Sequence, residues 1–336
     1  MNLNDNNYAQ FVLVREMMDT VGTVARFDAS CTKDLAARVK QAGRIMFSGE
    51  GSSRIFPAKN AARKSKTWGL DLNIQFEGAR QAAQYDLSKY VTVLASNSGR
   101  TKEVLMLAKQ LEAQGHPCRF GLTANEGTPL EKACTQTHVL GCGWEQAVAA
   151  TKSVVEQALW CESLIWHLAG RDMREALAGL PAKLETAMTQ AIPQEIVSWA
   201  VGANTIYFAG YNDGVAEELT LKTNEITRRK SDFLEGTYAL HGIEEVMEPC
   251  DVVFIIDPIE SEYEKYKSVL EGNARLHVVA IADHETPFTT IRVPSAGDLQ
   301  QYVYLCAGWN LLVEIGLALK INLDKPQHAR KVGNEW

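Results

Sequence analysis

The chain has 336 residues, of which 46% are hydrophobic and 22% charged, a composition that excludes an intrinsically disordered protein. A formal net charge of −7 without any long basic cluster excludes nucleic acid and anionic membranes as expected partners. The seven cysteines follow no metal-ligand or Cys-x-x-Cys spacing, so neither a disulfide framework nor a metal site is expected. With no apolar run of membrane-spanning length and no signal pattern in residues 1–20, we expect a cytoplasmic protein of about two domains.

The first half of the chain alternates strand-like and helical segments. Apolar side chains at helical spacing predict a helical lead-in over residues 1–35. Short, β-branched apolar runs at 44–48, 90–95 and 119–123, with a weaker one at 138–140, predict buried parallel strands. Helical stretches follow them, ending in a long helix expected over 147–169. This rhythm predicts a first domain over residues 36–172.

The second half repeats this plan after a helical connector expected over 173–195. Strands are predicted at 205–209, 251–256 and 276–282, with helices at 215–229, 260–271 and 299–319. The second domain is therefore expected over 196–320, followed by a polar tail over 321–336. The predicted fold class is α/β: two units, each a parallel sheet flanked by helices in a three-layer sandwich of the flavodoxin or Rossmann kind.

The turn between the predicted strand at 90–95 and the next helix is rich in hydroxyl groups. It reads Ser96, Asn97, Ser98, Gly99, Arg100 and Thr101. Backbone N–H groups and the positive helix end make such a turn an anion site, and three hydroxyls with one guanidinium suit a phosphate. An ordinary capped loop is the alternative, because serine and threonine cap helices without any ligand.

A second small, polar turn follows the first predicted strand, with Gly49, Glu50, Gly51, Ser52, Ser53 and Arg54. It partly matches the dinucleotide-binding fingerprint, and Asp71 lies where a ribose-binding acid would be expected. However, Arg54 replaces the third glycine, which is needed for close packing of helix on strand. The two turns therefore favour a small phosphorylated ligand, and no nucleotide cofactor is expected.

Three motifs in order resemble a known family. Gly-x-Gly-Ser-Ser at 49–53, Ser-Asn-Ser-Gly-x-Thr at 96–101 and Val-Ala-Ala-Thr-Lys-Ser at 148–153 resemble the sugar isomerase (SIS) domain, as found in the isomerase half of glucosamine-6-phosphate synthase and related amino-sugar-phosphate isomerases and deaminases. Leu-Lys-Thr-Asn-Glu-Ile at 221–226, His241-Gly242 sixteen residues after Glu225, and a tail with Asp-Lys-Pro at 324–326 and Lys331 are also similar to this family. The resemblance covers about residues 35–336 and implies two SIS-type units.

The resemblance implies roles for individual residues. An aldose–ketose interconversion moves a proton between C1 and C2 through an enediol or enolamine, which one carboxylate in a poorly hydrated pocket can perform. By the match, Glu225 is that base, His241 handles ring opening, Lys222 contacts the same substrate, and Lys331 lies on a tail that closes as a lid. The implied substrate-binding residues are Gly51, Ser52, Ser53, Ser96, Asn97, Ser98, Thr101, Val148, Ala149 and Ala150.

The expected function is therefore that of a phosphosugar isomerase or amino-sugar-phosphate deaminase, without cofactor or metal. Two alternatives stay open: a deglycase of amino-acid–sugar phosphates, and a non-catalytic sugar-phosphate sensor. Taken alone, Lys222 and Glu225 are typical of a solvated ion pair three residues apart on a helix. The family resemblance also implies a homodimer with the active site at the subunit interface, because the histidine comes from the second subunit.

Overall fold

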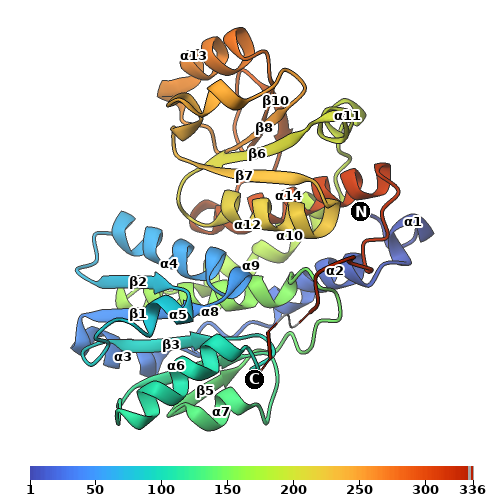
Figure 1. The fold of residues 1–336 in the computed structure, drawn as a ribbon. Helices are drawn as coiled ribbons and strands as arrows, with labels where there is room; N and C mark the ends of the chain where they lie inside the picture. The colour runs from blue at the N-terminus through green and yellow to red at the C-terminus, as the bar shows by residue number, and fades with distance from the viewer. Residues whose placement is uncertain (332–333, 336) are drawn as a thin grey trace. The chain divides into compact units, whose positions relative to one another are not determined.

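The computed structural model describes residues 1–331, 334 and 335, and the chain divides into two compact units (Figure 1). The N-terminal unit consists of Gly22–Ala178 together with Ala329–Trp336, and the C-terminal unit consists of Met1–Val21 together with Gly179–His328. Within the described residues, no helix has the length and apolar character needed to cross a membrane.

The N-terminal unit contains one five-stranded parallel sheet in the order β2-β1-β3-β4-β5. Its strands are β1 (Arg44–Gly49), β2 (Asn73–Glu77), β3 (Val91–Ala95), β4 (Arg119–Thr123) and β5 (Gln136–Val139). Its helices are the end of α2 (Val12–Ala25), then α3 (Lys33–Ala42), α4 (Ile55–Thr67), α5 (Ala79–Ala82), α6 (Lys102–Ala113), α7 (Pro129–Ala133), α8 (Lys152–Leu168) and α9 (Arg174–Ala178).

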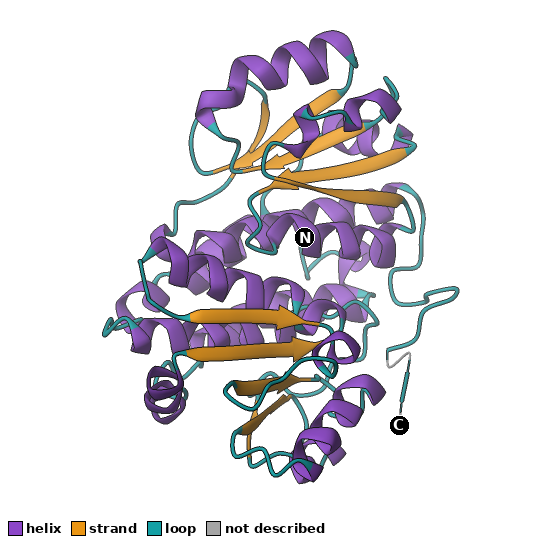
Figure 2. Ribbon diagram, turned by 60° about the vertical axis from the view of Figure 1, so that its left-hand side comes forward, coloured by secondary structure: helices purple, strands orange, loops and turns teal. Residues whose placement is uncertain are grey.

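Alternate side chains of each strand point to opposite faces of this sheet, and both faces are buried under helices. Ile45 and Phe47 of β1 lie in the core formed with α3, α4 and α8. Met46, between them, lies in a second core formed with α5, α6 and α7. Helices therefore cover the sheet on both sides, giving three layers (Figure 2).

The C-terminal unit contains a second parallel sheet in the order β10-β9-β8-β6-β7. Its strands are β6 (Thr205–Gly210), β7 (Lys230–Glu235), β8 (Val252–Ile256), β9 (His277–Ala282) and β10 (Thr289–Arg292). Its helices are α1 (Asn6–Ala9), α10 (Leu180–Thr189), α11 (Gln194–Gly202), α12 (Val215–Lys222), the π-helical η2 (Thr223–Thr227), α13 (Tyr263–Tyr266), the π-helical η6 (Lys267–Asn273) and α14 (Gln300–Ala318). Counted from its own first strand, this sheet has the same strand order as the first.

The two faces of the second sheet are covered by different elements. Tyr207 and Ala209 of β6 pack in a core with α13, η6 and residues 239–240. On the opposite face lie α12 and α14 (Figure 1), and α14 is buried along nearly its whole length. A helix that is apolar on all sides is expected in such a position, because it is enclosed by α10, α11 and α12.

The predicted fold class of two parallel-sheet units is confirmed, with corrections to individual elements. Three edge strands, β2, β7 and β10, were not predicted, because edge strands are half exposed and their polar residues interrupt the apolar run. The helix predicted over 215–229 ends at Lys222 and continues as η2. The helix predicted from residue 147 starts at Lys152, since residues 147–151 form a loop.

Candidate functional site

The two hydroxyl-rich turns lie at one edge of the N-terminal sheet. Strands β1 and β3 are parallel neighbours whose last residues, Gly49 and Ala95, are paired in register. The chain leaves β1 and β3 toward opposite ends of the sheet, and ligands of open α/β sheets bind outside the carboxyl ends of strands at such a switch point. Residues 51–53 and 96–101 are therefore on either side of the position that suits a ligand.

The turn 96–101 is held by its own side chains. The Oγ atoms of Ser96 and Thr101 lie 2.8 Å apart within hydrogen-bonding distance, and the Ser98 hydroxyl accepts from the backbone N–H of Arg100 at 3.2 Å. The backbone oxygen of Asn97 accepts from the N–H of Ala124 at 3.0 Å. Thr101 is the N-cap residue of α6, so the turn leads into a helix N-terminus, where anions are favoured.

Gly99 is required by the shape of this turn. Its φ of +64° is in the left-handed region, and an added Cβ would lie 2.4 Å from the Cβ of Thr128. Gly127 has a similar φ of +67° but has nothing within 4 Å of an added Cβ. The two glycines thus share the backbone cost of a substitution and differ only in the steric clash.

We predict that Gly99→Ala weakens binding of inorganic phosphate by more than about tenfold, because relieving the clash displaces the 96–101 turn. Gly127→Ala, the matched control, should cost only about 1 kcal/mol of stability and leave phosphate binding unchanged. Isothermal titration of both variants with phosphate measures the difference, and equal affinities would contradict this role of the turn.

The third motif forms a loop around a buried carboxylate. Val148, Ala149 and Ala150 precede the first turn of α8 in non-helical conformation. The side chain of Glu145 is fully buried and accepts hydrogen bonds from the backbone N–H of Thr151 at 2.8 Å, from the Ser153 hydroxyl and from the Asn97 amide at 3.1 Å. Glu145 therefore links this loop to the turn 96–101.

Lys331 lies beside the same carboxylate. Its Nζ is 3.5 Å from Oε2 of Glu145, and its side chain is 17% exposed. Burial by itself would raise the pKa of Glu145, but the charge of Lys331 and the hydrogen bonds from Ser153 and Thr151 hold that pKa below its usual value. Glu145 was not singled out in the sequence; a glutamate three residues before Val148 was the available signal.

In the C-terminal unit, the buried Lys222 forms ion pairs with two carboxylates, those of Glu225 and Glu218. The Lys222 ammonium is fully buried, 2.8 Å from Oε2 of Glu225 and 3.2 Å from Oε1 of Glu218. Burial alone would lower the pKa of Lys222, but the charges of Glu225 and Glu218 raise it above its usual value. Glu225 is 22% exposed, on the π-helical η2, so one carboxylate of the group reaches the surface.

This geometry excludes a solvated surface pair, because the ammonium that holds Glu225 has no exposed surface. Glu218 was missed in the sequence, although charged residues at 218, 222 and 225 have the spacing of one helix face. A π-helical turn at this point was not visible in the sequence. Such turns occur frequently at functional sites.

His241 lies elsewhere in the same unit. Ala239 and Leu240, just before it, pack in the core on the α13 face of the sheet, whereas η2 with Glu225 packs against α12 and α14 on the other face. The His241 side chain is exposed, and it makes no hydrogen bond within the described part of the chain. One chain therefore does not bring Glu225 and His241 together.

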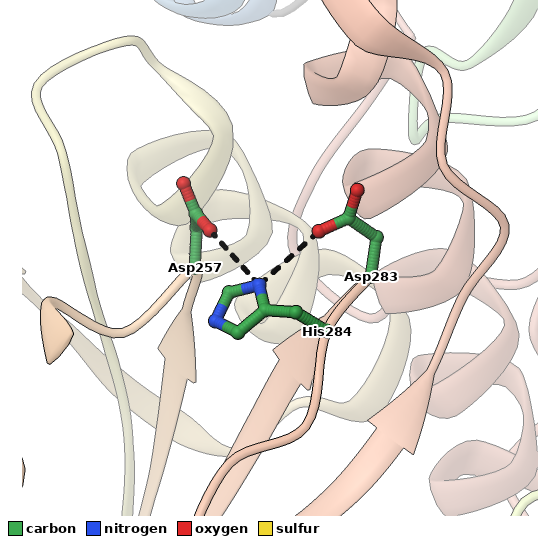
Figure 3. A group of neighbouring side chains, drawn as sticks. All are labelled: Asp257, Asp283 and His284. Carbon is green, nitrogen blue, oxygen red and sulfur yellow. Dashed lines mark hydrogen bonds and ion pairs between the residues drawn. The ribbon is translucent and has the colours of Figure 1, made fainter.

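A further polar group lies at the carboxyl ends of β8 and β9 (Figure 3). Nδ1 of His284 is 3.2 Å from Oδ1 of Asp283 and 3.9 Å from Oδ1 of Asp257. The hydroxyl of Tyr304 lies within hydrogen-bonding distance of Asp257 at 3.2 Å and of Asp283 at 3.3 Å. These are residue types that could ligate a divalent cation. The side chains are partly exposed and already satisfy one another by hydrogen bonds, so a structural role explains them.

The sequence of the chain is similar to known proteins in its first half and over most of its length. Residues 39–166 match the SIS domain family. Over 265 residues the chain is 26% identical to glutamine–fructose-6-phosphate aminotransferase (isomerizing) of Aeropyrum pernix, an alignment that covers 72% of this chain. The aligned region spans only 43% of that relative's length.

Solved structures share the fold of nearly the whole chain. The C-terminal domain of glucosamine-fructose-6-phosphate aminotransferase from Francisella tularensis has a TM-score of 0.78 at 16% identity, covering 94% of this chain and 98% of that one. Glucosamine-6-phosphate deaminase from Thermotoga maritima has a TM-score of 0.70 at 19% identity, covering 96% and 99%. Residues 39–166 are therefore similar to the SIS domain family, which confirms the resemblance inferred from the sequence motifs.

Proposed function

We propose that the chain is an enzyme acting on a sugar 6-phosphate, by aldose–ketose isomerisation or by deamination of an amino-sugar phosphate. The observation that carries the proposal is the group formed by Glu218, Lys222 and Glu225. Burying a charged lysine is costly unless it is paired, and here the pairing with Glu218 and Glu225 fixes the Glu225 carboxylate from its buried side. The group presents one partly exposed carboxylate with a fixed orientation, as a general base requires.

In the proposed reaction, Glu225 removes a proton from one of the two carbons C1 and C2 and returns it to the other, through an enediol or enolamine. Lys222 fixes the Glu225 carboxylate from its buried side. The substrate phosphate is bound by the turns at 51–53 and 96–101. Val148, Ala149 and Ala150 offer backbone groups to the sugar, since they lie outside α8.

We also propose a homodimer in which His241 acts in the site of the second copy. The separation of Glu225 and His241 on opposite faces of one sheet supports this arrangement. Tyr238 and Val246, on either side of His241 in sequence, are 48% and 66% exposed.

We predict that mixing two inactive variants, Glu225→Gln and His241→Asn, restores activity. In a mixed dimer one site retains both intact residues, so random exchange of subunits should restore about one quarter of the wild-type sites. The measurement is turnover after the two variants are co-expressed in equal amounts and purified without separating mixed dimers from the two homodimers. Activity that stays at the level of the separate variants would contradict a site shared between subunits.

The direct test of the reaction is deuterium incorporation at C1 and C2, followed by NMR in heavy water. The panel is fructose, glucose, glucosamine and fructosyl-amino-acid 6-phosphates. Exchange with a hexose or hexosamine phosphate supports isomerisation or deamination, and exchange only with the amino-acid conjugate indicates a deglycase. Tight binding without exchange on any substrate would overturn the enzymatic proposal in favour of a sugar-phosphate sensor.

A further inference from the structure

Residues of the C-terminal tail dock on the N-terminal unit at two places. The backbone of Glu335 forms a bridge with Thr101, and the N–H of Lys102 donates to the carbonyl of Asn334 at 3.1 Å. Lys331, nearer the start of the tail, reaches Glu145. The first contact is with the beginning of α6 and the second with the loop before α8, so the tail touches both sides of the turn 96–101.

The carboxylate of Glu145 is a buried negative charge whose position is fixed by hydrogen bonds. It is fully buried, and its donors are Thr151 before α8, Ser153 in the first turn of α8, and Asn97, so both carboxylate oxygens are held in place. These donors are neutral, and Lys331 is the cation whose charge lowers the pKa of Glu145. A buried carboxylate without a cation would be costly, and the partly buried Lys331 compensates that charge.

We propose that Glu145 is a positioning residue that docks the C-terminal tail by holding Lys331 beside the turn 96–101. The docking depends only on the contacts described above. Its consequence for turnover rests on the proposed function, because it fixes Lys331 next to the turn that would bind the substrate phosphate. Glu145 acts in this scheme through Lys331 and does not itself touch the reacting atoms.

Hydrogen–deuterium exchange of the C-terminal peptide tests the docking without any substrate. Lys331→Arg should keep the protection of the peptide, Lys331→Ala should lower it by about tenfold, and Lys331→Glu should lower it further, since it brings a second carboxylate against a buried one. Arg330→Glu is the matched control, because Arg330 is an exposed neighbour in the same tail. Equal protection in Lys331→Ala, Lys331→Glu and Arg330→Glu would overturn the proposal.

A substitution of Glu145 itself links docking to turnover. Glu145→Gln and Lys331→Ala should lower kcat by the same factor, and the double variant should lose no more than either alone, while the affinity for inorganic phosphate is unchanged. Independent, additive losses would contradict a role through Lys331. If Glu145→Gln does not fold, the exchange protection of the C-terminal peptide in Lys331→Glu and Lys331→Ala still tests whether Lys331 docks the tail. If the tail responds as expected but no sugar phosphate is turned over, the docking stands and the proposed function fails.

Discussion

Glu225→Gln is expected to lower turnover and C1–C2 proton exchange by about 10²- to 10⁴-fold, the range for removal of a general base. The amide keeps the volume of the side chain and can still contact Lys222, so the fold should be preserved, but it cannot accept a substrate proton. Binding of inorganic phosphate should be unchanged, because the proposed phosphate turns lie in the N-terminal unit. The measurements are deuterium exchange by NMR and phosphate titration.

Glu264→Gln is the control for this prediction, because Glu264 is an exposed glutamate in the same unit, on α13. It should exchange deuterium at the wild-type rate. Wild-type turnover in Glu225→Gln would remove Glu225 from the mechanism. A parallel loss of phosphate affinity would instead indicate that the substitution had disturbed the fold.

Lys222→Met should lower the free energy of unfolding of the C-terminal unit by about 3–5 kcal/mol, because it leaves the fully buried Glu218 carboxylate without its cation. Glu218→Gln in the same chain should recover part of this loss, since it removes the unpaired charge. Urea denaturation followed by circular dichroism measures both variants. Lys265→Met, an exposed lysine on α13, is the control and should stay within about 0.5 kcal/mol of wild type.

The pH dependence of this contribution follows from the direction of the pKa shift. The pKa of Lys222 is raised in the folded state by Glu225 and Glu218, whose charges outweigh burial. The stabilisation is therefore fully present below the unfolded lysine pKa of about 10.4 and is lost as the pH rises through the folded value. The stability difference between Lys222→Met and wild type should be constant from neutral pH to about pH 10 and shrink above it. A difference that disappears near pH 7 would contradict the assigned charge state.

The sequence determined the elements whose pattern is local. Fully buried strands read as continuous apolar runs, so β1, β3, β4, β6, β8 and β9 were predicted within a residue or two. The strand-to-helix turns followed from them, because hydroxyl and glycine residues come directly after an apolar strand. The SIS domain resemblance depended on these two turns and on the motif at 148–153, in that order, and it is confirmed by the match over residues 39–166.

Only the tertiary structure decided which residues share an environment. Lys222 ends α12, and both α12 and the following η2 pack against α14, which lies far along the chain. The sequence alone therefore could not distinguish an exposed lysine from a buried one. Glu145 and Lys331 are separated by most of the chain, and the pairing of Glu145 with the tail required the folded unit. His241 and Glu225 are close in sequence, yet β7 and its crossover place them on opposite faces of a sheet. Local spacing specifies helices, strands and turns, whereas burial and charge pairing arise from long-range packing.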